Sequence, residues 1–184
     1  MHRVHIDVAN AAQELTPRAK DSLVSFGERL STRIFASYLR TQGVPARQFD
    51  AWDIGLVTSD EFTNAEIQCD SSLTAVHACV TKHVAETREI PVITGFLGRG
   101  VATGAITTLG RGGSDLTATF VGAALGVDEV VVWKDVDGVL TSDPRLVRDA
   151  RVISTLTYEE ATELAYFGAQ VCNHIIPFSK ATYR

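Results

Sequence analysis

The sequence is poor in residues that cross-link a chain. Its 184 residues include only three cysteines, Cys69, Cys79 and Cys172, which form neither a CxxC pair nor an even set. A disulfide framework is therefore not expected, and a reducing compartment fits best. His77 and His83 lie near Cys79, but this spacing matches no standard zinc pattern, so we predict no metal site held by the protein alone.

Long apolar runs and basic runs are also lacking. The longest apolar stretch, around residues 127–133, contains Asp128 and Glu129 and is far shorter than the roughly 20 residues that cross a bilayer. The formal net charge is −5. With no basic run to hold a phosphate backbone, nucleic acid is not expected as a partner. The first ten residues lack the apolar core of a secretory signal. These absences predict neither a membrane nor a nucleic-acid partner.

What is present is typical of one folded domain. Apolar residues make up 45% of the chain and charged residues 21%, as in ordinary globular proteins. Thr16 and Pro17 form a helix-start signal, and apolar residues recur at helical spacing from there to Gly43. The sequence predicts a long amphipathic helix, broken or closely approached near Gly27. The two tryptophans, Trp52 and Trp133, are expected to pack in the core.

Strand and helix signals alternate along the rest of the chain. We expect extended segments at 46–49, 54–58, 90–94, 106–109 and 130–133, helices at 65–89 and 114–126, and a loop at 96–100. A capping box, Thr157 to Glu160, predicts the start of another helix. This alternation indicates α/β layers around a mainly parallel sheet.

The glycine-rich segment LGRGGSD, residues 109–115, falls between a predicted strand and a predicted helix. Its glycines allow backbone N–H groups to approach an anion at a helix N-terminus. A strand-to-helix connection that binds nothing is an equally simple interpretation of the glycines alone. Arg111 and Asp115 favour a ligand, because a guanidinium matches a carboxylate and a carboxylate matches an ammonium group. The pattern fits neither a dinucleotide fingerprint nor a Walker A loop.

Two further segments carry charges at informative places. WKDVDGVLTSDPR, residues 133–145, follows a predicted strand, where α/β folds place ligands, although a solvated turn is the alternative. Glu28 follows Gly27 on the first helix, where a surface glutamate is the simpler interpretation.

Five ordered motifs resemble the aspartate kinases of the amino-acid kinase family, in the version found in plants and related bacteria. They are SFGERLST at 25–32, ITGF at 93–96, TTLGRGGSD at 107–115, WKDVDG at 133–138 and YFGAQV at 166–171. The resemblance implies an amino-acid kinase three-layer α/β sandwich. It also implies transfer of the γ-phosphoryl group of ATP, with Mg²⁺, to L-aspartate. The product, 4-phospho-L-aspartate, leads to lysine, threonine and methionine.

Site residues follow from the same resemblance. It implies that Glu28, Arg111, Gly112, Gly113 and Ser114 bind aspartate, and that Asp115 and Arg111 take part in catalysis. For ATP it implies contacts with Lys134, Asp135, Leu140 and Arg145, where Leu140 replaces a tyrosine of the enterobacterial form.

Two parts of the family pattern have no counterpart here. The Lys-Phe-Gly-Gly phosphate loop at the start of the family is missing, and so is the ACT-type regulatory region after residue 171. We therefore expect a single truncated kinase domain, residues 1–184, without feedback regulation. It would act as a homo-oligomer or with an intact kinase chain, in the cytoplasm or in a plastid. The alternatives are a catalytically silent aspartate-binding subunit and a relative that acts on another acidic small molecule.

Overall fold

The computed structural model describes residues 15–133, 139–143, 146–157, 159–160 and 163. The longest helix, α2 (Pro17–Thr41), begins where the sequence predicts. The Thr16 side chain accepts a hydrogen bond from a first-turn N–H at 3.2 Å, and Pro17 stands at the first helical position. The predicted disruption at Gly27 is wrong. The helix runs through it, and a Cβ there would meet nothing within 4 Å, so the roughly 1 kcal/mol cost of a helical glycine is outweighed by packing elsewhere.

The two sides of α2 differ in an unusual way. Its buried stripe is made of small and mostly polar residues, namely Asp21, Ser25, Thr32 and Ala36. The opposite side carries large apolar residues with exposed fractions of 53–68%, namely Leu23, Val24, Phe26, Leu30, Ile34, Phe35 and Tyr38. We call this second set the outer face of α2. The small residues allow α2 to lie close to the strands.

The strands form two small sheets. In the first, β1 (Ala46–Phe49) pairs in parallel with β3 (Ile90–Ile93), which confirms both predicted strands. In the second, β4 (Leu97–Gly100) lies between β2 (Val57–Thr58), to which it is parallel, and β5 (Ile106–Thr108), to which it is antiparallel.

The predicted loop at 96–100 is therefore wrong over most of its length. Its glycines suggested a turn, but a Cβ on Gly98 would overlap the Thr58 side chain on the neighbouring strand. Here glycine marks the close approach of two strands rather than a loop.

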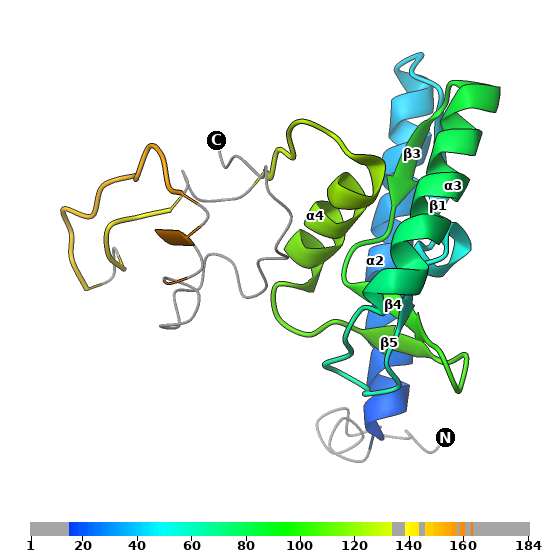
Figure 1. The fold of residues 1–184 in the computed structure, drawn as a ribbon, viewed down its shortest axis with the longest axis horizontal. Coiled ribbons are helices and arrows are strands. Elements are labelled where there is room, and N and C mark those ends of the chain that lie inside the picture. The colour runs from blue at the N-terminus through cyan, green and yellow to red at the C-terminus, as the bar shows by residue number, and fades with distance from the viewer. Residues whose placement is uncertain (1–14, 134–138, 144–145, 158, 161–162, 164–184) are drawn as a thin grey trace, which may run out of the picture.

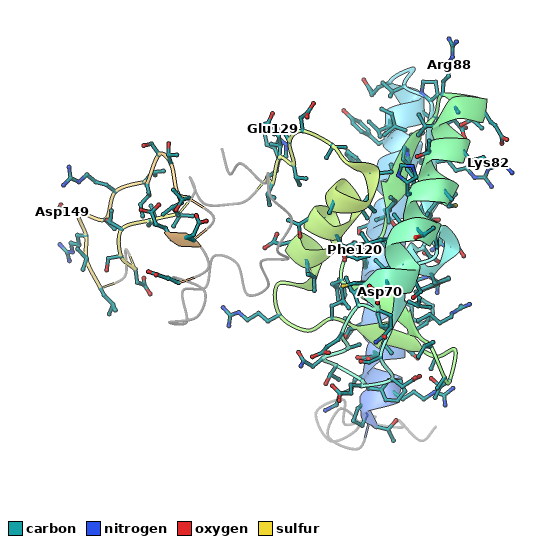
Figure 2. The ribbon with its side chains drawn as sticks, in the orientation of Figure 1. Asp70, Lys82, Arg88, Phe120, Glu129 and Asp149 are labelled. Atoms are coloured by element: carbon teal, nitrogen blue, oxygen red, sulfur yellow. The ribbon has the colours of Figure 1, made fainter. Side chains whose placement is uncertain are left out.

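Helices cover both sides of the first sheet (Figure 1). α2 packs on one side and α3 (Cys69–Thr87) on the other, with α4 (Gly113–Leu125) beside α3. The main core lies among α3, α4 and the 3₁₀ turn η1 (Ala51–Ile54), and Figure 2 shows Phe120 reaching from α4 into it. Its buried residues are Ala51, Ile54, Leu56, Val76, Val80 and Phe120. The predicted α/β class is confirmed.

The chain beyond α4 departs from prediction. Residues 130–133 form no strand, since no described strand lies alongside to pair with their backbone, and Trp133 is 93% exposed rather than buried. Trp52 is only partly buried, and the guanidinium carbons of Arg29 and Arg99 lie over its ring, 5.4 and 5.0 Å from the centroid. The described helices include none with the length and apolar character needed to span a membrane.

The capping box is confirmed. The Thr157 N–H donates to the Glu160 carboxylate at 2.8 Å, and the Glu160 N–H donates to the Thr157 hydroxyl at 3.2 Å.

Candidate active site

The glycine turn lies between β5 and α4, as the sequence predicts, and its backbone is tightly packed. Gly110 and Gly112 adopt φ angles of 72° and 77°, and the Gly113 N–H donates to the Gly110 carbonyl at 3.2 Å. A Cβ on Gly110 would stand 2.7 Å from the Asn64 Oδ1 atom. Both the backbone angle and the space therefore require glycine at position 110. Gly112 caps α4, and so the prediction that Ser114 or Asp115 forms the cap is wrong.

Phe96 ties the turn to the connection between β3 and β4. Its carbonyl accepts from the Leu109 N–H at 2.9 Å, and its N–H donates to the Thr117 hydroxyl at 3.0 Å. That hydroxyl in turn donates to the Gly113 carbonyl at 2.9 Å. These bonds hold the start of α4, the glycine turn and the β3–β4 connection as one unit. No sequence pattern indicates that Thr117 has this role.

Glu28 reaches the same unit from α2. One carboxylate oxygen, Oε1, accepts a hydrogen bond from the Gly95 N–H at 2.6 Å. A Cβ on Gly95 would stand 3.0 Å from the Ser114 hydroxyl and 3.3 Å from Glu28 Oε1. The structure thus brings Glu28 and Ser114, 86 positions apart in the sequence, together at Gly95. Glu28 is partly buried, so it is not the free surface side chain of the simpler interpretation.

Arg111 and Asp115 flank the start of α4. Arg111 is exposed on the turn, and Asp115 is partly buried in the first helical turn, where its carbonyl accepts from the Thr119 hydroxyl at 3.0 Å. A carboxylate so close to a helix N-terminus is favoured by the helix dipole. Near Glu28 and Ser114, the site therefore combines a cation, two carboxylates and backbone N–H groups. A zwitterion with an additional acidic group could satisfy this set of charges.

The residues predicted to contact ATP are mostly not described. Lys134, Asp135 and Arg145 lie outside the described residues. Leu140 forms a single antiparallel bridge with Val152, and in Figure 1 this segment stands apart from the layered helices and strands. Figure 2 places Asp149 on the same separate segment. The structure does not bring Leu140 to the glycine turn.

Asp60 organises the far end of the β4–β5 hairpin. It accepts hydrogen bonds from the N–H groups of Ala102 and Thr103 at 2.9 and 3.0 Å, and from the Thr103 hydroxyl. The hydroxyl, followed by the two amides, lowers the pKa of the Asp60 carboxyl below its ordinary value. Asp60 thus holds the tip of the hairpin whose base carries Phe96 and Leu109.

Comparison with known proteins agrees with the motifs. The amino acid kinase family model matches residues 2–175. The chain is 58% identical over 163 residues to Aspartokinase 1, chloroplastic, of Arabidopsis thaliana, covering 86% of this chain and 28% of that protein. Against Aspartokinase 3, chloroplastic, of the same plant the identity is 55%, with the same coverage.

A solved structure is similar as well. E. coli aspartokinase III in complex with aspartate and ADP matches with a TM-score of 0.76 and 37% identity, over 89% of this chain and 36% of that one. The chain therefore spans little more than a third, at most, of the length of these relatives. The resemblance to plant-type aspartate kinases is confirmed.

Proposed function

Because this chain belongs to the amino acid kinase family, we propose that it is the kinase domain of an aspartate kinase. The reaction transfers the γ-phosphoryl group of ATP to the side-chain carboxylate of L-aspartate and yields 4-phospho-L-aspartate, the first step toward lysine, threonine and methionine. The single observation that carries the proposal is the convergence of Glu28 and Ser114 on Gly95, beside the glycine turn.

The charges of the site suit aspartate in a definite orientation. Arg111 would hold the α-carboxylate with two parallel hydrogen bonds, and Glu28 would accept from the ammonium group. Glu28 has capacity for this, because a carboxylate offers about four lone-pair sites and Gly95 occupies one of them. Gly112, Gly113 and Ser114 would contact the substrate at the start of α4. Asp115, on the first turn of α4, would organise the reacting groups together with Arg111.

ATP would bind through residues of the segment after α4. Lys134, Asp135, Leu140 and Arg145 are the proposed contacts. The described part of the site fits a phosphate, because the glycine turn presents backbone N–H groups at a helix N-terminus.

Mg²⁺ bound with the nucleotide would neutralise the phosphate charge during transfer. Among the described residues no group of three or more His, Cys, Asp or Glu side chains could hold a metal ion. The ion would therefore take its ligands mainly from phosphates and water, with one or two carboxylates, as Mg²⁺ commonly does.

Calorimetric titration with L-aspartate tests the substrate site. We expect binding by the wild-type chain and a loss of about 10- to 100-fold in affinity for Glu28→Gln, because a hydrogen bond to a charged group contributes about 1.5–3 kcal/mol. Glu61→Gln, at an exposed glutamate, is the matched control and should bind as the wild type does. No binding by a demonstrably folded sample would contradict the proposed substrate.

A coupled assay with ATP, Mg²⁺ and L-aspartate then tests the chemistry. Turnover that Arg111→Ala abolishes and Arg18→Ala leaves unchanged would support the kinase and exclude a silent subunit. Aspartate binding without a phosphorylated product would favour the silent subunit instead. Turnover of another acidic amino acid in preference to aspartate would favour the third alternative.

For the partner, we propose that a second copy of the kinase domain covers the outer face of α2. The seven side chains of this face are each more than half exposed. If a fully exposed aromatic side chain offers about 150–250 Å² and an aliphatic one somewhat less, the whole face offers on the order of 700 Å² of apolar surface. This is close to the roughly 800 Å² that each partner buries in a standard interface. Sedimentation should show a dimer that Leu30→Glu dissociates and Val84→Glu, on the exposed side of α3, does not. If the wild-type chain were monomeric at every concentration, the proposed dimer would be wrong. If the chain paired only with an intact kinase chain, that intact chain would be the partner instead of a second copy.

The proposed location is a plastid, because the two plant relatives are named chloroplastic. A fluorescent fusion of the complete natural protein should localise to plastids in plant or algal cells. Uniform cytoplasmic fluorescence would contradict the proposal.

A further inference from the structure

A buried carboxylate on α2 has no part in the site as described so far. Asp21 is only 2% exposed. Its Oδ2 atom accepts from the Thr63 N–H at 2.9 Å and from the Thr108 N–H at 3.1 Å, and its Oδ1 atom accepts from the Thr108 hydroxyl at 2.8 Å. The donors lie 42 and 87 positions away in the sequence. Three donors satisfy a charge that would otherwise be costly to bury.

Asp21 and Glu28 stand on the same side of one helix. They are seven positions apart, which is two helical turns and about 10 Å along the axis. Glu28 holds the Gly95 amide, on the β3–β4 connection. Asp21 holds Thr108, two positions before Gly110 in the glycine turn. One rigid helix therefore carries the contacts to both walls of the proposed substrate site.

Asp21 also holds the loop at Thr63 and Asn64, which packs against the glycine turn. Thr63 has a φ of 70°, a conformation rare for a β-branched residue, and its N–H donates to Asp21. The Thr63 carbonyl and Asn64 Oδ1 lie 3.2 and 2.7 Å from the place where a Gly110 Cβ would stand. The Ala65 N–H donates to the Thr108 carbonyl at 2.8 Å. Besides that bond, the Asp21 carboxylate is the described contact that holds Thr63 in its strained conformation.

We propose that Asp21 is a positioning residue, which fixes the conformation of the glycine turn and its placement relative to Glu28. Asp21 does not touch the substrate and acts through Thr63 and Thr108. Its effect on aspartate binding rests on the proposed function, but its effect on the turn does not.

Substitutions at Asp21 separate charge from hydrogen bonding. In Asp21→Asn the amide oxygen can accept from both N–H groups, and the Thr108 hydroxyl can reverse to accept from the amide nitrogen. This variant should keep the network. Asp21→Leu has a similar branched shape, although its methyl groups are larger than carboxylate oxygens, and it leaves the N–H groups of Thr63 and Thr108 buried without an acceptor. Combining Asp21→Asn with Thr108→Val leaves the amide nitrogen buried against a methyl group without an acceptor, and this cost should weaken the network although the amide oxygen can still accept from both N–H groups.

Amide hydrogen exchange of the 184-residue chain measures directly how often the glycine turn opens. Asp21→Leu should raise exchange at residues 62–65 and 108–112 about tenfold or more beyond its effect on α3, since loss of local contacts opens local units first. Val80→Ala, which weakens the core without touching the network, should raise exchange evenly. Asp21→Asn should match the wild type. Thr108→Val keeps both N–H bonds but leaves Asp21 Oδ1 without its donor, so exchange at the turn should rise less than in Asp21→Leu. The double variant should resemble Asp21→Leu, and it provides the test if Asp21→Leu does not fold.

Titration with L-aspartate adds the functional readout. The affinity for L-aspartate should fall about tenfold or more in Asp21→Leu and in the double variant, because hydrogen bonds to a charged group hold the turn in place. The affinity should stay near the wild-type value in Asp21→Asn and Val80→Ala. If the wild-type chain binds no aspartate, the proposed substrate is wrong, while the exchange pattern still decides the role of Asp21. An even rise in exchange in Asp21→Leu, like that of Val80→Ala, would overturn the inference. So would a double variant whose turn exchanges as slowly as that of Asp21→Asn.

Discussion

The first turn of α4 packs so closely on its neighbours that one methyl group tests the site geometry. A Cβ on Gly113 would stand 2.8 Å from the Cβ atoms of both Leu109 and Phe96. Those atoms are bonded to the backbone and cannot turn away, so α4 must shift relative to the β3–β4 connection. Such overpacking costs about 1–3 kcal/mol, partly offset by alanine's preference for helices of about 1 kcal/mol. We expect Gly113→Ala to lower the free energy of unfolding by about 1 kcal/mol.

The same substitution at Gly27 should act in the opposite direction. Gly27 lies inside α2 with nothing within 4 Å of its added Cβ, so alanine brings only its better helix propensity. We expect Gly27→Ala to raise the free energy of unfolding by about 0.5–1 kcal/mol. The two variants have identical chemistry, and only their surroundings differ.

Urea unfolding and aspartate titration together distinguish these effects, at a protein concentration where the wild type is monomeric. Gly113→Ala should lower the urea midpoint with an unchanged slope and weaken aspartate binding about tenfold, because a shift of α4 moves Ser114 and Asp115. Gly27→Ala should raise the midpoint and leave binding unchanged. If Gly113→Ala were as stable as the wild type and bound aspartate equally well, the close packing described for this turn would be wrong.

Three further substitutions test the scaffold. The folded state lowers the pKa of Asp60. The stabilisation from this carboxylate is therefore present above the ordinary aspartate pKa and is lost as pH falls through the lower folded pKa. Asp60→Asn should flatten the dependence of the urea midpoint on pH below about pH 4. Phe120→Ala, at a fully buried core position, should cost about 3–5 kcal/mol in urea unfolding. Thr16→Ala removes the cap of α2 and should cost about 0.5–2 kcal/mol by the same measurement, whereas an unchanged midpoint would show that the cap contributes nothing.

The elements predicted correctly from the sequence are those whose signals are local. The cap at Thr16, the strand at 46–49, the glycine turn and the end of α4 at Gly126 all depend on residues within one or two turns of chain. The capping box at 157–160 is of the same kind. At Thr16 and at the capping box, the side chain and the backbone group that it satisfies are neighbours in sequence.

The errors occur where a distant neighbour decides the outcome. Gly98 belongs to a strand because the neighbouring strand, with Thr58, lies against it. Residues 130–133 include three β-branched valines, but they form no strand because no described segment pairs with them. The candidate site shows the same division. The motifs pointed to Glu28, Gly113 and Ser114, but the contact of Glu28 with the Gly95 amide joins positions 67 apart. No local pattern could predict that contact.

The orientation of α2 is the clearest case of this kind. Its apolar residues recur at helical spacing, which ordinarily identifies the side that faces the core. Here the opposite stripe is buried, and it carries Asp21 and Ser25. Asp21 and Glu28 accept hydrogen bonds from three segments of the chain, and these bonds are made with the polar stripe of α2 turned inward and the large apolar residues outside. The inner stripe carries the carboxylate contacts beside the glycine turn, and the outer face carries the exposed apolar residues. A rotation of α2 that improved burial of the outer face would break both carboxylate contacts. The proposed pairing with a second copy would cover the outer face and leave those contacts intact.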